Sequence, residues 1–187
     1  MEIKHRSQLN ELLMHHHGAL GNVAEIGVAE GLYSKDILGW GVSMLYLVDI
    51  WNHKPDVRGD GNSIQEWHDN NYNAVVERLK EYKDKTVFLK GDSVEMAKEV
   101  PEGSLSLVYI DADHSYEGVK RDIAAWYPKL SVGGIMAFHD YESPAYGVKQ
   151  AVNEFAANND LEVHSIPENH PDDAGAWFQK NKPQFKI

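Results

Sequence analysis

Short apolar runs alternate with longer amphipathic stretches along most of this chain. Apolar runs bounded by turn residues predict strands, and stretches with apolar residues three or four positions apart predict helices. The predicted strands cover residues 23–28, 44–49, 86–90, 105–110, 135–138, 161–165 and 174–179, and the predicted helices cover residues 6–17, 32–38, 64–82, 93–99, 116–128 and 147–157.

The order of these elements predicts the fold. A strand and a helix alternate five times, and two strands then follow with only a loop between them. Alternating units of this kind build a parallel sheet with helices on both faces. The last two strands lack a crossover helix and therefore predict an antiparallel hairpin at the edge. We expect an α/β, Rossmann-like doubly wound sheet of about seven strands in a single domain over residues 1–187, with residues 1–20 as an N-terminal helical segment.

Composition excludes several classes of function. The formal net charge is −11, so nucleic acid and anionic membranes are poor partners. The absence of cysteine excludes disulfides, thiolate metal ligands and a cysteine nucleophile. No apolar stretch approaches the roughly 20 residues of a membrane span, and the first residues lack the apolar core of a signal peptide. We expect a cytoplasmic protein that acts on a small molecule, with formation of a homo-oligomer left open.

The motif Glu25-Ile26-Gly27-Val28-Ala29-Glu30-Gly31 joins the first predicted strand to a helix. Its two glycines predict a turn in which the backbone approaches a neighbour closely, and amides at a helix start suit a carboxylate or phosphate. The motif lacks the compact G-x-G-x-x-G pattern, and Glu30 would repel a pyrophosphate. A zwitterion fits better, with its amine facing Glu25 and its carboxylate bound by the turn amides and Ser34.

Polar residues also follow the second and third predicted strands, where open parallel sheets bind ligands. Asp49, 24 residues after Glu25, is placed to accept hydrogen bonds from both hydroxyls of a ribose. Trp51 is placed to lie against an adenine, and Asp92 and Ser93 to bond its edge. A single acid at such a position is as often a helix cap, but the whole series favours a common site. Together with the zwitterion, this series predicts S-adenosylmethionine as the ligand.

Acids and histidines follow the fourth and fifth predicted strands. Asp111 and Asp140 are expected at neighbouring strand ends and are natural ligands for a hard divalent cation, which would help to deprotonate a hydroxyl. His139 is either a general base or a third ligand that shifts the preference towards Mn²⁺ or Fe²⁺. His114 is a second base or a substrate contact, and Asp113 is expected to cap the next helix.

Over roughly residues 23–179 the chain resembles class I S-adenosylmethionine-dependent methyltransferases, in the order of its elements and the positions of its motifs. Residues 25–31 look like their first glycine motif, and Asp49 looks like their ribose-binding acid. A narrower similarity, to bacterial small-molecule methyltransferases related to the macrocin and cephalosporin-pathway O-methyltransferases, is carried by Asp111-Ala112-Asp113-His114-Ser115-Tyr116-Glu117, Gly133-Gly134-Ile135 and His139-Asp140.

The resemblance implies methyl transfer from S-adenosylmethionine to a small-molecule hydroxyl, assisted by Mg²⁺ or Mn²⁺. It also implies that Asp111 serves both the cofactor and the metal, with Asp140 as the second metal ligand. The third ligand of such families is typically an Asn or an acid adjacent to the second Asp, whereas here His139 and Tyr141 flank Asp140 and Glu142 follows. This departure leaves the third ligand open.

Other interpretations stay open. A nicotinamide-dependent oxidoreductase shares the architecture but requires the missing compact glycine motif. A metal-dependent hydrolase would explain the ten histidines but not the glycine turn, and a non-catalytic nucleoside-binding protein of the same fold fits as well. The run 15–17 of three histidines is a polar helix end or a metal site. Residues 50–66 are expected to form a lid and residues 141–146 a second wall of the site.

Overall fold

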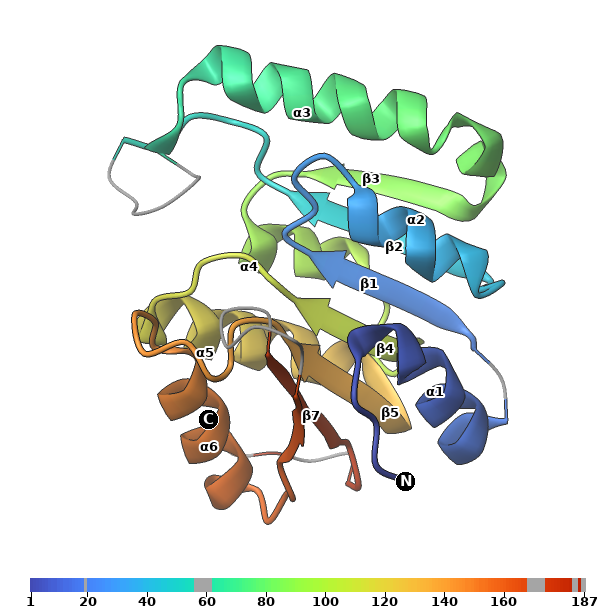
Figure 1. Ribbon diagram of the computed structural model, residues 1–187, viewed down its shortest axis with the longest axis vertical. Coiled ribbons are helices and arrows are strands. Elements are labelled where there is room, and N and C mark those ends of the chain that lie inside the picture. The colour runs from blue at the N-terminus through green and yellow to red at the C-terminus, as the bar shows by residue number, and fades with distance from the viewer. Residues whose placement is uncertain (19, 56–61, 168–173, 183–184, 186–187) are drawn as a thin grey trace.

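The computed structural model describes residues 1–18, 20–55, 62–167, 174–182 and 185. A sheet of seven strands in the order β3-β2-β1-β4-β5-β7-β6 forms its centre (Figure 1). The strands are β1 (Asn22–Ile26), β2 (Met44–Asp49), β3 (Thr86–Lys90), β4 (Leu105–Ile110), β5 (Leu130–Phe138), β6 (His164–Ile166) and β7 (Gly175–Gln179). The first five pair in parallel, and β7 pairs antiparallel with both β5 and β6. The predicted α/β sheet with an antiparallel edge hairpin is confirmed.

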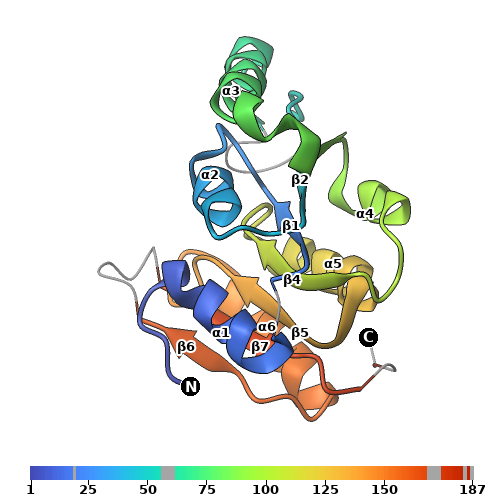
Figure 2. The same cartoon turned by 90° about the vertical axis from the view of Figure 1, so that its right-hand side faces the viewer.

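Helices cover both faces of this sheet (Figure 2). The α-helices are α1 (Leu9–His17), α2 (Leu32–Gly39), α3 (Gln65–Arg78), α4 (Ser93–Met96), α5 (Tyr116–Trp126) and α6 (Val148–Asn158), and short 3₁₀ helices are η1 (Arg6–Gln8), η3 (Lys80–Lys85), η4 (Ala97–Glu99) and η5 (Tyr127–Lys129). Residues of α1, α2 and α3 pack in one core, and residues of α5 and α6 pack in the other. Successive residues of a strand point to opposite faces, so Val108 of β4 belongs to one core and Tyr109 to the other.

The fifth strand was predicted to begin after Gly133-Gly134, and this start is wrong. Strand β5 begins at Leu130 and contains both glycines. Its register with β4 shifts between Leu105 and Leu107, and Gly133 has a φ of +88°. The glycines therefore accommodate an irregularity inside a long strand, as glycines in strands often do.

Further boundaries differ from the prediction, beginning with β1, which ends at Ile26 rather than at residue 28. The predicted helix 64–82 ends as α3 at Arg78, and η3 continues with a non-helical Tyr82 inside it. The predicted helix 6–17 divides into η1 and α1. Strand β6 begins at His164 rather than at residue 161. Over the described ranges, no helix is both long and apolar enough to cross a membrane.

The sheet order places the first strand at its topological switch point. Strand β1 lies between β2 and β4, so the chain leaves β1 towards one side of the sheet and later elements extend the other side. Open α/β sheets bind their ligands in the crevice outside the strand ends at this point. The glycine turn after β1 lies at that crevice.

Candidate functional site

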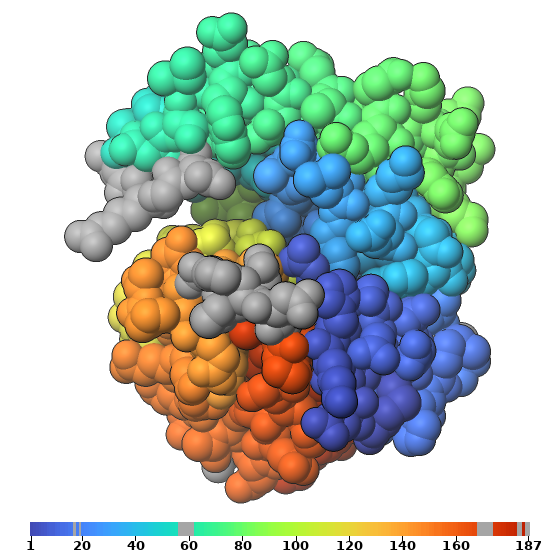
Figure 3. All heavy atoms as spheres, in the orientation of Figure 1, coloured from blue at the N-terminus to red at the C-terminus, as the bar shows by residue number. Residues whose placement is uncertain are grey.

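A cavity of about 640 Å³ opens at the carboxyl ends of β1, β2, β3 and β4, a volume in the range of small-molecule sites. In Figure 3 the surface is hollowed between the green α3 region and the yellow and orange residues below it. The predicted site residues that line the cavity are Glu25, Gly27, Asp49, Trp51, Asp92, Ser93, Asp111 and His114; Gly31, Ser34, His139 and Asp140 are not among its lining residues.

The glycine turn donates two of its amides to the protein itself. The N–H groups of Val28 and Ala29 each donate to Oδ2 of Asp49 over 2.8 Å, and the N–H of Trp51 donates to Oδ1 over 3.0 Å. The prediction that the turn amides bind a ligand carboxylate is therefore wrong for these two. A carboxylate offers about four acceptor positions, so Asp49 retains about one for a ligand, fewer than two ribose hydroxyls require.

Both glycines of the turn make the close approach that was predicted, but their neighbours belong to the protein. Gly27 has a φ of +88°, and a Cβ there would lie 1.8 Å from the backbone oxygen of Asp111. Gly31 has a φ of +73°, and its Cβ would lie 2.3 Å from Cγ2 of Val75. The first glycine lets β1 and β4 end side by side, and the second lets α3 pack on the turn. The assignment of Gly31 to the ligand is corrected.

Glu25 is a buried acid at the edge of the cavity. Its side chain accepts a hydrogen bond from the hydroxyl of Ser34, which is fully buried. Burial raises the pKa of Glu25 to about 8, although the bond from Ser34 acts in the opposite direction. Ser34 thus supports Glu25 from behind, and its predicted contact with a ligand carboxylate is corrected.

Trp51 lines the cavity, but almost all of its surface packs against the protein. Its side chain is 1% exposed, and its Nε1 donates to the backbone oxygen of Ala29 over 2.9 Å. The ring lies 5.1 Å from that of Tyr72 in an edge-on arrangement and 6.1 Å from that of Phe88. This indole fixes the glycine turn against the sheet, and its stacking on adenine stays a prediction.

Asp92 and Ser93 line the cavity with their side chains already engaged. Oδ1 of Asp92 accepts from the N–H of Val94 at the start of α4, and Oδ2 accepts from Nζ of Lys54 over 3.1 Å. Although burial opposes it, the bonds and charge of Lys54 lower the pKa of Asp92. The hydroxyl of Ser93 accepts from Nε1 of Trp126 over 2.8 Å. Both side chains at this end of the cavity are therefore held by hydrogen bonds within the protein.

Two acids and two histidines form a cluster at the ends of β4 and β5. Nε2 of His114 lies 3.2 Å from Oδ1 of Asp111 and 3.0 Å from Oδ2 of Asp140. Burial alone would lower the pKa of His114, but these two contacts raise it to about 10. Nδ1 of His139 lies 2.9 Å from Oδ2 of Asp140, and the pKa of Asp140 is lowered because its contacts with both histidines outweigh burial. The two carboxylates therefore favour the protonated form of His114.

The cluster has the donor set of a divalent cation site. Ligand atoms of Asp111, His139 and Asp140 all lie within 4.8 Å of one another. Two carboxylates with an imidazole suit Mn²⁺ or Fe²⁺ better than Mg²⁺. Neither Tyr141 nor Glu142 adds a ligand to this group. The hydroxyl of Tyr141 donates to Asn153, and the carboxylate of Glu142 pairs with Lys149. His114 competes with a cation for the same two carboxylates.

The helix that follows β4 begins with a different cap from the one predicted. Ser115 is the N-cap of α5, and its hydroxyl accepts from the N–H of Gly118. Asp113 instead accepts from the N–H of Ser115 over 2.9 Å. The capping role expected of Asp113 therefore belongs to Ser115.

Four basic residues of the cavity were missed from the sequence: Arg6, Lys54, His68 and Arg121. The guanidinium carbon of Arg6 lies 4.9 Å from the centre of the Tyr33 ring, so η1 contributes to the cavity wall. Neither Arg6 nor Lys54 stands in a recognisable motif. His68 precedes the buried Val75 by seven residues, and this helical spacing is the signal that places it on the inner face of α3.

A family model described as a methyltransferase domain matches residues 24–141. The uncharacterized protein y4gI of Sinorhizobium fredii is 29% identical over 114 residues, which are 60% of this chain and 12% of that protein. This chain therefore matches about an eighth of the length of that relative.

Solved structures share the fold. The O-methyltransferase NovP superposes with a TM-score of 0.63 and 22% identity, covering 94% of this chain and 80% of that one. An rRNA methylase from Streptococcus thermophilus superposes with a TM-score of 0.65 and 14% identity, covering 94% of this chain and 95% of that one.

Proposed function

We propose that this chain, which belongs to the methyltransferase-domain family, transfers a methyl group from S-adenosylmethionine to a hydroxyl of a small molecule. The observation that carries the proposal is the placement of three acids in one cavity. Glu25, Asp49 and Asp92 lie in or just after three neighbouring strands, β1, β2 and β3. In that order they suit the amine, the ribose and the adenine of the cofactor.

The methionine end of the cofactor is assigned to Glu25 and Arg6. Both residues line the cavity, and the charge of Arg6 is close enough to oppose the effect of burial on the pKa of Glu25. The N–H groups of Val28 and Ala29 already donate hydrogen bonds to Asp49. The carboxylate of the cofactor therefore requires another partner. A guanidinium is well suited to bind a carboxylate.

The acceptor is assigned to the side of the cavity next to His114. The imidazole of His114 stacks on the ring of Tyr146 with 4.6 Å between ring centres. Tyr146 and Leu32 line the cavity and are 45% and 60% exposed. An apolar rim next to a polar cluster suits a molecule with an apolar body and a reacting hydroxyl.

Bound S-adenosylmethionine supplies the methyl group, carried on a sulfonium. A divalent cation held by Asp111, His139 and Asp140 would acidify the acceptor hydroxyl. His139 is not among the cavity-lining residues, so we assign the general base to His114 and a positioning role to His139. His114 would first release its own proton to solvent when its contacts with the two carboxylates are lost, and its neutral Nε2 would then accept the proton of the acceptor hydroxyl. The rest of the cavity wall aligns the two reactants, which can contribute much of the rate.

A small-molecule acceptor is favoured over nucleic acid by charge. The protein carries a formal charge of −11, and polyanions bind surfaces that neutralise phosphates with clustered Lys and Arg. The fold is shared with a protein described as an rRNA methylase, but the charge of this chain opposes such a substrate.

The experiment is calorimetry with S-adenosylmethionine, S-adenosylhomocysteine and NAD, followed by transfer of labelled methyl groups to a panel of hydroxyl, amine and RNA acceptors. We expect both sulfur nucleosides to bind and NAD not to. If neither sulfur nucleoside binds more tightly than about 1 mM, roughly −4 kcal/mol, the proposal is wrong. Transfer to amines or RNA without transfer to hydroxyls would contradict the acceptor class alone. Transfer should stop with EDTA and return with Mn²⁺.

A further inference from the structure

The hydrogen bonds of Asp49 leave part of the ribose without an acceptor. A ribose presents two neighbouring hydroxyls, each of which needs a partner when it is buried. Oδ2 of Asp49 accepts from Val28 and Ala29, and Oδ1 accepts from Trp51. About one acceptor position remains on this carboxylate, which suffices for one hydroxyl. The second hydroxyl must find its acceptor elsewhere in the cavity wall.

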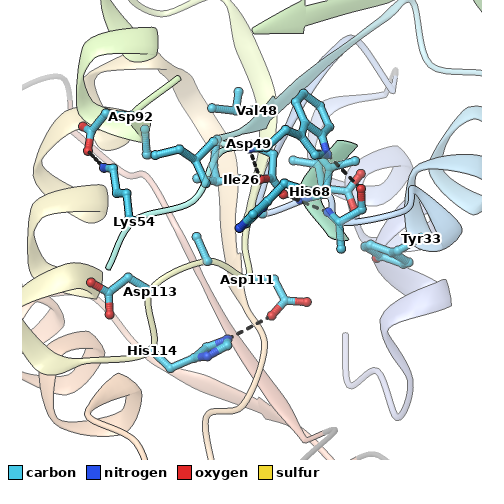
Figure 4. Close-up of a pocket in the computed structure, with 18 of the residues that line it drawn as sticks. Ile26, Tyr33, Val48, Asp49, Lys54, His68, Asp92, Asp111, Asp113 and His114 are labelled. Atoms are coloured by element: carbon cyan, nitrogen blue, oxygen red, sulfur yellow. Dashed lines mark hydrogen bonds and ion pairs between the residues drawn. The ribbon is translucent and has the colours of Figure 1, made fainter. Parts of the chain in front are cut away.

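His68 offers such an acceptor. It lines the same cavity as Asp49, and its side chain is 2% exposed. Its Nε2 is buried and has no hydrogen-bond partner among the residues that the structure describes. In Figure 4 a ring nitrogen of His68 points into the open space above Asp111 and His114 in this view. A buried polar atom without a partner costs free energy, and a bound ligand would relieve that cost.

The packing of α3 explains why His68 lies over this part of the cavity. Gly31 permits Val75 to sit directly on the glycine turn, because a Cβ at Gly31 would collide with that side chain. His68 is seven residues earlier on the same face of the helix, which is roughly 10 Å along its axis. The imidazole of His68 therefore lies nearer the start of the helix than Val75, towards the open cavity. Its ring packs edge-on against Trp67 with 5.0 Å between ring centres.

We propose that Nε2 of His68 accepts a hydrogen bond from the ribose hydroxyl of the cofactor that Asp49 does not bind. This inference rests on the proposed function. A neutral imidazole carries one donor and one acceptor nitrogen, so it can serve a hydroxyl without introducing a charge. Among the described residues His68 belongs to no cluster of metal ligands, the group found being Asp111, His139 and Asp140. His68 and Asp49 together would then bind the diol.

The test compares ligands that differ by one hydroxyl. Affinities for S-adenosylhomocysteine and for its 2′-deoxy and 3′-deoxy analogues are measured by calorimetry on the wild type, His68→Leu and His68→Gln. Leucine fills the site without an acceptor, and glutamine retains one. His164→Leu is the matched control, because His164 lies on the edge strand β6 and does not line the cavity.

We expect His68→Leu to bind S-adenosylhomocysteine about tenfold more weakly and to bind one of the two deoxy analogues as well as the wild type does. His68→Gln should recover part of the loss, and His164→Leu should change nothing. An equal loss for all three ligands would reduce His68 to a structural role and overturn the inference, as would an unchanged affinity for S-adenosylhomocysteine. If the wild type itself binds no sulfur nucleoside, the proposed function fails instead.

Discussion

Nε2 of His114 lies 3.0 Å from Oδ2 of Asp140. The same nitrogen contacts Asp111, and the two carboxylates keep the imidazole protonated with a pKa raised to about 10. A protonated imidazole and a divalent cation cannot both hold these carboxylates closely. The position of His114 therefore predicts how strongly the cluster binds metal.

We predict that His114→Gln raises the affinity for Mn²⁺ about tenfold, because it removes a charged donor whose hydrogen bonds a cation must displace. Asp140→Asn should abolish binding by removing an anionic ligand. Calorimetry on EDTA-treated protein measures both. His164→Gln is the control, since His164 lies on the edge strand and stacks on Trp177. A lower Mn²⁺ affinity in His114→Gln would identify His114 as a ligand rather than a competitor.

Asp49 is predicted to contribute to both binding and stability. Asp49→Ala should weaken binding of S-adenosylhomocysteine at least tenfold, because a ribose hydroxyl loses its acceptor. It should also lower the free energy of unfolding by about 1–3 kcal/mol, because the amides of Val28 and Ala29 lose theirs. Calorimetry and urea denaturation measure the two effects. Asp36→Ala, an exposed acid on α2, should change neither, and an unchanged stability in Asp49→Ala would mean that these amide bonds contribute nothing.

The buried strands could be predicted closely from the sequence. Strands β2, β3 and β4 have the predicted bounds, because a run of apolar residues between polar turns has few other structures available in a buried sheet. The start of strand β5 could not be predicted from the sequence, because Gly133-Gly134 resembles a turn. The two glycines are accommodated within the strand through its pairing with β4.

The sequence predicts part of the cavity wall, but not what each side chain does there. The sequence indicates that Asp49 and the glycine turn meet, since both follow neighbouring strands. It does not indicate that the carboxylate would accept the turn amides, because hydrogen bonds between residues 20 or 21 positions apart depend on the assembled backbone. The same limit applies to Ser34, which pairs with Glu25 behind the cavity wall.

The methionine end of the site can be tested with a shortened ligand. 5′-Methylthioadenosine keeps the nucleoside and the sulfur but lacks the amino acid portion of the cofactor. We predict that Arg6→Met and Glu25→Gln each weaken binding of S-adenosylhomocysteine about tenfold or more and leave binding of 5′-methylthioadenosine unchanged. Arg121→Met is the matched control, because Arg121 also lines the cavity but acts on the pKa of Asp92 at the β3 end. Equal losses for both ligands in Arg6→Met would remove Arg6 from this end.

Binding of the amino acid portion should depend on pH through Glu25. The pKa of Glu25 is raised to about 8 by burial, so only about 1% of this carboxyl is ionised at pH 6 and about half at pH 8. An ammonium group prefers the ionised form, and binding at low pH must therefore release a proton. We predict that the affinity for S-adenosylhomocysteine rises at least tenfold from pH 6 to pH 8. Affinity for 5′-methylthioadenosine should stay level, and a slope that persists in Glu25→Gln would assign the effect to another group.

The last prediction separates backbone strain from steric contact at the glycine turn. Gly27 and Gly41 have φ angles of +88° and +89°, so alanine meets the same conformational penalty of about 1–2 kcal/mol at either position. Nothing lies within 4 Å of a Cβ at Gly41, whereas at Gly27 the backbone oxygen of Asp111 lies at 1.8 Å. We expect Gly41→Ala to lower the free energy of unfolding by that penalty alone. Gly27→Ala should cost about 1–3 kcal/mol more, because β1 and β4 must separate.

Urea denaturation gives the two free energies of unfolding, and calorimetry with S-adenosylhomocysteine gives the effect on the site. Gly27→Ala should also weaken ligand binding, since separation of the strand ends moves Glu25 away from Asp111, whereas Gly41→Ala should bind normally. Equal destabilisation by the two substitutions would show that the turn relaxes around the added methyl group. The close approach at Gly27 would then have no part in holding the cavity together.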